Sequence, residues 1–195
     1  MVTSSGNRGV VCATDDVSAR IEELQFTLGE GPCMDATELG GPVLVPDLEQ
    51  HDDLVVERWP AFLEGAVDAG VRALFAFPLR IGAINVGAMD LYRERPGELL
   101  PWQLSGALTA SDTAAVALLD AGSGMAAGFA DDVETRSAYR LEVHQATGMV
   151  REQLGVPIEE AFVRLRARAF ASGRPVADVA RDVVGRRMRF TMEEE

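Results

Sequence analysis

The chain has 195 residues, enough for one or two domains, and 47% of them are hydrophobic, enough for a packed core. No stretch approaches the ~18 consecutive apolar residues of a membrane-spanning helix, so no membrane association is expected. Residues 1–11 lack the charged start and apolar run of a signal peptide. Cys12 and Cys33 are too few for a disulfide framework. We therefore expect a cytoplasmic protein with reduced thiols.

The net charge of −13 is distributed unevenly along the chain. Residues 1–135 carry 7 arginines and 22 acids, whereas residues 136–190 carry 11 arginines and 6 acids, a local balance of +5. The chain contains no lysine. An RNA phosphate backbone would prefer the basic third. On charge alone, a solvated helix surface with mixed charges is an equally good interpretation.

The first part of the chain alternates short apolar runs with turn-forming residues. Residues 9–13 have strand character, and residues 14–19 are polar and typical of a turn. Residues 20–28 fit either a helix or the edge of a sheet. A Gly-Glu-Gly-Pro-Cys turn cluster occupies residues 29–33, and it is not a phosphate-binding loop because no Lys-Ser/Thr follows it. Residues 43–45 predict a short strand.

Longer elements follow. Residues 59–69 have helical spacing that ends at Gly70. Residues 71–79 and 83–92 are rich in aromatic and branched side chains, and they predict an antiparallel hairpin at the centre of a sheet. Residues 101–119 predict a helix whose apolar positions are Leu104, Leu108, Ala115, Leu118 and Leu119.

Residues 1–120 resemble a GAF domain, a small sensory module. The blocks that carry the resemblance are Leu28-Gly29-Glu30-Gly31-Pro32-Cys33, Val45-Pro46-Asp47-Leu48, Phe77-Pro78-Leu79 and Gly87-Ala88-Met89-Asp90-Leu91-Tyr92. The resemblance implies an antiparallel sheet with flanking helices and an unidentified small-molecule ligand. A complete GAF domain usually begins with a helix and a strand that would precede this chain's start. An apolar face left without that helix needs a cover, so we expect a homodimer.

Residues 121–130 are rich in Gly, Ala and Ser, which indicates a linker or a helix break. One long helix is expected from about Asp131 to Leu154. The positions Val133, Tyr139 or Arg140, Val143, Ala146 and Val150 form a stripe with a spacing near seven residues. This stripe fits pairing with a partner's helix, and it also fits packing against the preceding domain.

Three helical pieces follow one another over residues 143–184. Their apolar faces consist of Val143, Ala146, Val150 and Leu154, then Ile158, Ala161, Phe162, Leu165 and Ala169, then Val176, Val179, Ala180 and Val183. The breaks lie at Gly155-Val156-Pro157 and Ser172-Gly173-Arg174-Pro175. Glycine can end a helix in the left-handed conformation, and proline suits the first turn of the next.

This segment resembles the ANTAR domain of bacterial transcription antitermination regulators. The matching residues are Gln145-Ala146-Thr147-Gly148-Met149-Val150, Gly155-Val156, Glu160-Ala161-Phe162, Leu165-Arg166, Ala169 and Asp178-Val179-Ala180. Pro157 departs from the Ser or Asp helix cap that is usual there. The resemblance implies a three-helix ANTAR bundle at residues 131–190 that binds RNA hairpin loops and favours readthrough of terminators. GAF domains joined to ANTAR domains form a known signal-transduction architecture, an α/β domain followed by an all-α one.

Several residues of this bundle are candidates for RNA binding. Planar arginine can stack on a base or bind a phosphate through two parallel hydrogen bonds, and small residues allow close approach. The candidates are Arg151, Arg164, Arg168 and Arg174 off the apolar stripes, Arg166 in the family's Leu-Arg pair, Gln145, and Ala146, Gly148, Met149 and Ala169. Arg166 could brace the helices instead, the small residues could serve helix packing, and Met149 could fill the core.

Two other functions remain open at this stage. Three short helices also suit a helix-turn-helix DNA-binding module. Some GAF-fold proteins reduce methionine sulfoxide with cysteines, but Cys12 and Cys33 lack evident activating groups. His51 and His144 are isolated, and a metal site needs three or four clustered ligands. We expect a non-enzyme without a cofactor or metal.

Overall fold

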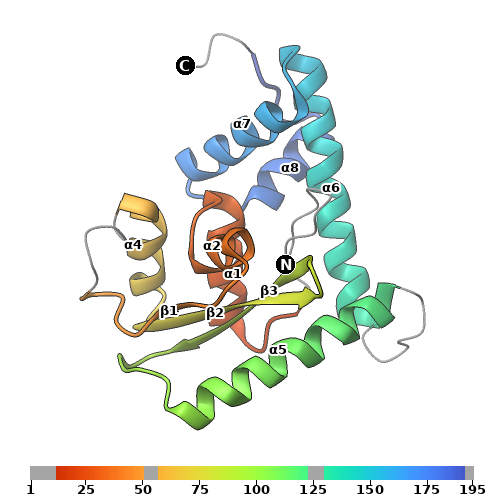
Figure 1. Ribbon diagram of the computed structural model, residues 1–195. Helices are drawn as coiled ribbons and strands as arrows, with labels where there is room; N and C mark the ends of the chain where they lie inside the picture. The colour runs from red at the N-terminus through yellow and green to blue at the C-terminus, as the bar shows by residue number, and fades with distance from the viewer. Residues whose placement is uncertain (1–11, 51–56, 123–129, 192–195) are drawn as a thin grey trace. The chain divides into compact units, whose positions relative to one another are not determined.

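The computed structural model describes residues 12–50, 57–122 and 130–191, and it divides into two compact units, residues 1–132 and 133–195 (Figure 1). Within the described residues there are seven helices and one three-stranded antiparallel sheet. The division falls near the start of the long helix α6 (Ala130–Leu154), and helix α5 (Pro101–Gly122) extends into the expected linker, most of which lies outside the described residues. None of the helices in the described ranges combines the length and apolarity needed to cross a membrane.

Helix α1 (Asp16–Leu28) begins inside the segment that the sequence assigned to a turn. Asp15 accepts a hydrogen bond from the Ser18 backbone N–H at 2.7 Å, and Ser18 Oγ accepts one from the Asp15 N–H at 3.1 Å. This reciprocal cap satisfies amide groups that the first helical turn leaves without partners. The turn prediction for residues 14–19 was therefore wrong, because these polar residues are a helix start. The strand expected at residues 9–13 lies mostly outside the described residues.

The sheet confirms the predicted hairpin. Strands β2 (Ala73–Ile81) and β3 (Ile84–Arg93) pair antiparallel with Phe77 opposite Met89, and β1 (Val43–Val45) pairs with the other edge of β2. The order is β1-β2-β3, so β2 is central and β3 lies at an edge of the described sheet. The predicted helix at residues 59–69 is α4 (Pro60–Asp68).

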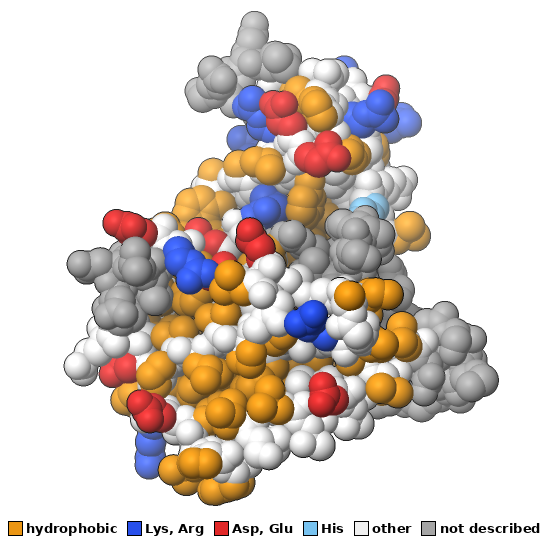
Figure 2. Space-filling model, viewed as in Figure 1, with side chains coloured by type: hydrophobic (Ala, Val, Ile, Leu, Met, Phe, Trp, Pro, Cys, Tyr) orange, Lys and Arg blue, Asp and Glu red, His pale blue; other side chains and the backbone are white. Residues whose placement is uncertain are grey.

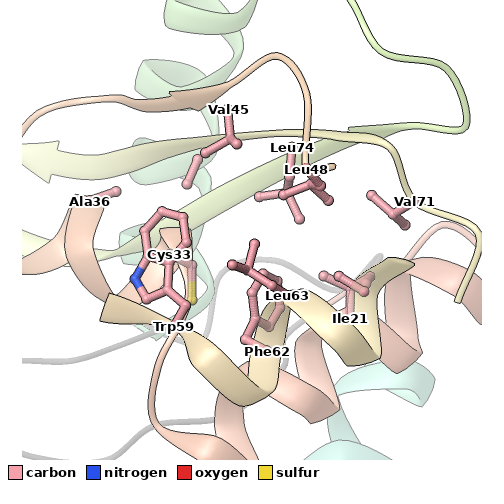
Figure 3. Packing of buried hydrophobic residues seen from close by; sticks show 12 residues of the cluster. Ile21, Cys33, Ala36, Val45, Leu48, Trp59, Phe62, Leu63, Val71 and Leu74 are labelled. Carbon is pink, nitrogen blue, oxygen red and sulfur yellow. The ribbon is translucent and has the colours of Figure 1, made fainter. Parts of the chain in front are cut away.

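Two layers of helix enclose the sheet of the N-terminal unit (Figure 1). On one face, α1, α2 (Pro32–Leu39) and α4 bury a core in which aromatic and aliphatic side chains from the helices meet those from the strands (Figure 3). On the other face, α5 packs against Ala73, Phe75 and Phe77 through Leu104 and Ala107. Ala115 is buried as expected, but Leu108 and Leu119 are exposed, so only part of the predicted apolar face of α5 packs within the chain.

The Gly-Glu-Gly-Pro block joins three elements of this unit through one buried amide. Gln25 of α1 is 1% exposed, its Oε1 accepts a hydrogen bond from the Cys33 N–H at 2.8 Å, and its Nε2 donates to Asp90 of β3. Gly31 has a φ of 128°, and a Cβ there would lie 2.6 Å from Gln25 Oε1. The turn therefore requires glycine for both conformation and space.

Glu30, in the same block, holds the start of α4. Its Oε1 accepts hydrogen bonds from the Ala61 and Phe62 N–H groups, both at 2.8 Å. A carboxylate in this position satisfies free amides and complements the positive end of the helix dipole. The block thus acts as a structural junction, consistent with the absence of a phosphate-loop pattern.

The C-terminal unit contains α6, α7 (Ile158–Ala171) and α8 (Val176–Val184). Gly155 and Gly173 follow α6 and α7 with φ of 67° and 61°, as the sequence predicted. Pro157 and Pro175 each immediately precede a helix instead of lying in its first turn, and neither supplies a side-chain cap. At α7 the acidic Glu159 and Glu160 complement the helix dipole in the first turn.

Nearly all of the apolar positions predicted for the three helices form the core of this unit. The fully or almost fully buried residues are Val143, Ala146, Val150, Ala161, Leu165, Ala169, Val176, Val179, Ala180 and Val183. Ile158 is an exception at 44% exposed, because it lies at the very start of α7. The sequence also gave no indication that Phe190 returns to this unit, where it is buried and donates its N–H to Gln153 Oε1 at 2.8 Å.

Asp90 makes the stability of the N-terminal unit depend on pH. Burial, and then the nearby Glu22 carboxylate, raise the pKa of Asp90 well above its ordinary value of 3.8, and its Oδ1 has no hydrogen-bond partner among the residues that the structure describes. The folded state therefore binds this proton more tightly than the unfolded state does. The resulting stabilisation is complete below about pH 3.8 and is lost as the pH rises toward the raised pKa.

We predict that Asp90→Asn weakens the fall in unfolding free energy as the pH rises above about 3.8, because the neutral amide has no proton to lose. Urea unfolding followed by tryptophan fluorescence measures this, since Trp59 and Trp102 both lie in the N-terminal unit. The exposed Asp68, at the end of α4, gives a matched control, Asp68→Asn, that retains the wild-type pH dependence. An Asp90→Asn profile parallel to that of the wild type would contradict the prediction.

Candidate nucleic-acid interface

The outer side of α7 carries arginines on both flanks of an exposed apolar row. Leu165 and Ala169 point into the core, so residues half a turn away point outward. Arg164 and Arg168 are four residues apart and share one flank, whereas Arg166 lies on the other. All three guanidinium-bearing side chains are half-buried, with stems along the helix surface.

Acidic neighbours partly neutralise these arginines. Arg164 lies 3.4 Å from Glu160 one turn earlier, and Arg151 lies 3.6 Å from Glu152. The Arg164 side chain is 39% exposed and the Arg151 side chain 56%. Exposed pairs of this kind contribute only about 0–1 kcal/mol each, so a phosphate can replace the carboxylate at little cost.

Arg174 lies closer to its acidic partner than Arg164 and Arg151 do to theirs. It donates to Asp182 Oδ2 at 2.8 Å, and Arg187 donates to Asp182 Oδ1 at the same distance. These hydrogen bonds, that from Arg174 foremost, lower the pKa of Asp182 below its ordinary value. Arg174 therefore also ties the α7–α8 turn to α8, and its substitution would affect the fold as well as any ligand.

Arg166 is positioned by an aromatic ring. Its Cζ lies 5.6 Å from the centroid of Phe162, four residues earlier on α7. Such a cation–π contact holds the guanidinium plane along the helix. This contact is made within α7 and fixes the position of the guanidinium on that helix.

The α6 candidates separate into buried and accessible residues. Ala146 is fully buried, as is Ala169 on α7, so their side chains serve helix packing. Gln145 is exposed, and Gly148 and Met149 are half-buried. A Cβ at Gly148 would meet nothing within 4 Å, so close packing inside this unit does not explain the glycine. Its accessible backbone leaves room for a ligand.

The expected helix-pairing stripe on α6 is partly used inside the unit. Val143, Ala146 and Val150 are buried within the chain. These three positions therefore are not available to a partner's helix. The side chains of Val133, Tyr139 and Arg140 lie outside the described residues.

The other candidate sites are the two cysteines, a possible metal site and a pocket in the N-terminal unit. Cys33 is buried in the N-terminal core and Cys12 is exposed. In the described ranges, no three or more His, Cys, Asp or Glu side chains are grouped to hold a metal ion. A polar pocket of about 450 Å³ lies beside α2, where Arg58 pairs with Asp35 and lies over the Trp59 ring. Burial raises the pKa of Asp35, although Arg58 opposes this.

Comparison with known proteins identifies part of the chain. Residues 131–184 match the ANTAR domain, a module known from RNA-binding antitermination regulators. A solved domain described as part of a two-component sensor histidine kinase protein from Sinorhizobium meliloti 1021 is 20% identical over 43% of this chain, with a TM-score of 0.35. The chain covers 54% of that domain, about half its length. No curated protein matches the chain.

Two exposed features escaped the sequence analysis. Phe170 lies on the outside of α7, and Arg186, Arg187 and Arg189 follow α8 on an exposed segment. An aromatic residue outside the apolar spacing of an arginine-rich helix was the available signal for Phe170. The arginines lie just beyond the last predicted helix, where periodicity gives no guide.

We predict that Arg164→Ala combined with Arg168→Ala weakens RNA binding and leaves the fold intact, because neither side chain belongs to the buried set. Loss of two phosphate contacts reduces the salt dependence by roughly 0.7 in slope per contact for single-stranded RNA. Binding titrations at several salt concentrations measure this. The matched control is Arg20→Ala with Arg95→Ala, two exposed arginines of the N-terminal unit.

Unchanged affinity with unchanged melting in the Arg164/Arg168 variant would place the RNA-binding surface elsewhere, around Gln145, Gly148 and Arg151. A lowered melting temperature would instead identify the two arginines as structural.

Proposed function

We propose that this protein is a transcription antitermination regulator whose ANTAR domain binds hairpin loops of RNA. The ANTAR match at residues 131–184 carries the proposal. The arginines of α7 and the accessible backbone at Gly148 support it, because guanidinium groups can bind phosphates and an open backbone allows a nucleotide to approach. Binding to a hairpin would stabilise an antiterminator and let transcription continue.

In this proposal the N-terminal unit is a GAF-like sensor that controls the RNA-binding domain, and both act in the cytoplasm. An antiparallel sheet covered by helices on both faces suits such a module. The polar pocket beside α2 is a place where a small-molecule ligand would meet Asp35 and Glu38. The protein acts by binding, without making or breaking a bond, and turnover of methionine sulfoxide with consumption of thiol would contradict this.

We predict that the full-length chain binds hairpin RNA more tightly than duplex DNA of equal length at the same salt concentration. Single-stranded loops expose base faces and edges, whereas a duplex hides them in the stack. Fluorescence anisotropy with labelled RNA and DNA gives the two affinities. Equal or stronger binding to DNA would favour the helix-turn-helix alternative, in which a helix enters the major groove.

We further propose that the regulator is a homodimer, with α5 at the contact between subunits. Figure 2 shows hydrophobic side chains gathered over α5 and the neighbouring strands. Trp102 is 70% exposed, and Leu108, Val116 and Leu119 are exposed on the same helix. Asp112 is the one charged residue between positions 101 and 119. An exposed apolar surface on a helix with so few charges is costly in water and suits burial against an identical surface.

Sedimentation at micromolar concentration should give about twice the 20.9 kDa mass of one chain. Val116→Asp should shift the distribution toward monomer, because a charge would be buried at the contact. Leu39→Asp, at an equally exposed leucine on α2, is the control and should remain dimeric. A wild-type chain that sediments as a monomer would refute the homodimer.

A further inference from the structure

Phe170 is the largest exposed apolar side chain among the described residues of the C-terminal unit. It follows the buried Ala169 in the last turn of α7, yet 60% of its surface is exposed. We propose that the Phe170 ring is a stacking platform for one unpaired base of an RNA hairpin loop, a binding subsite that rests on the RNA-binding function proposed above. A single exposed apolar residue is common, so its surroundings must carry the assignment.

The ring ends a row of planar groups. Phe162, Arg166 and Phe170 follow one another at intervals of four residues and therefore share one side of α7. The Arg166 guanidinium already lies over the Phe162 ring, with 5.6 Å between Cζ and the ring centroid. Phe162 and Arg166 are half-buried, whereas the ring at the end of the row is exposed. A base placed on Phe170 would add a further planar group at the exposed end of this row.

Two of the side chains near Phe170 on the helix surface are small. Ala167 precedes it by three residues on the outer side of α7, and Ala171 follows it at the end of the helix. Neither side chain extends beyond a methyl group, so a flat base can approach the ring. Aromatic side chains stack on any base because every base has a π face, and the contribution is about 1–3 kcal/mol per base.

Charge decides between a nucleotide and an apolar protein surface as the occupant. Residues 163–175 contain four arginines, Arg164, Arg166, Arg168 and Arg174, and no acidic residue, although Glu160 and Asp182 from outside this range pair with Arg164 and Arg174. An apolar partner would have to bury or displace these charges, which is costly. A nucleotide provides a base for the ring and a phosphate for the neighbouring guanidinium groups. A single nucleotide then contacts both the aromatic ring and the arginines.

The test is a double-mutant cycle between protein and RNA, performed with the full-length chain. A hairpin RNA that the wild-type chain binds is prepared with each loop nucleotide in turn replaced by an abasic one. Phe170→Ala should weaken binding to the intact hairpin by about 5- to 100-fold, which corresponds to the loss of one stacked base. Phe170→Trp should retain the affinity. Val163→Ala, at an equally exposed residue on the same side of α7, should change it less than about twofold.

One abasic position should weaken wild-type binding and have little further effect on Phe170→Ala, which identifies the stacked base. The salt dependence of Phe170→Ala should equal that of the wild type, because no phosphate contact is lost. Unchanged binding by Phe170→Ala, or a loss shared equally by all abasic positions, would overturn the subsite and leave the RNA-binding function standing. A loss accompanied by altered melting or sedimentation would assign Phe170 to protein packing instead. Failure of the wild-type chain to bind any hairpin RNA would overturn both proposals.

Discussion

The close packing of small side chains between α6, α7 and α8 is the constraint on which the candidate RNA surface depends. Ala146 of α6, Ala161 and Ala169 of α7 and Ala180 of α8 are fully buried. Methyl groups at these positions let helix backbones approach closely, and larger side chains there would force the helices apart. With the core confined to one side of each short helix, the arginines of α7 must lie on its outer side. The position of the candidate RNA surface therefore follows from which residues are buried in the core.

The N-terminal unit depends on a polar junction instead. Gln25 links α1, the turn before α2 and strand β3, and Glu30 fixes the start of α4 from the same turn. Buried hydrogen-bonded groups of this kind specify one arrangement of elements, because each partner left unpaired costs about 1–3 kcal/mol. Asp90 introduces an ionisable group into this junction, and its raised pKa couples the unit's stability to pH.

The electrostatics of the two parts of the chain are opposite in sign. The acidic residues are concentrated before residue 136, and the arginines after it. Around α7 the ion pairs are exposed and individually weak, so phosphates can compete for Arg164. Arg174, in contrast, donates a 2.8 Å hydrogen bond to Asp182, which also accepts one from Arg187. Within one arginine-rich segment, some side chains are available to a ligand and others maintain the fold. Counting the arginines in the sequence does not distinguish these two groups.

The sequence by itself determined the hairpin β2–β3, the helices α4 to α8 and nearly all of the C-terminal core, because strict spacing of apolar residues and the glycines at helix ends act locally. It also indicated the ANTAR domain through spaced blocks of residues, which the family match confirms. It misjudged the start of α1, because a polar capping box and a polar turn have similar composition. Only the tertiary structure decided that Gln25 joins three elements, that Ala146 and Ala169 are buried while Gly148 is open, and that Phe190 returns to α6. These facts depend on contacts between residues far apart in the chain, and periodicity within one segment carries no information about its distant partners.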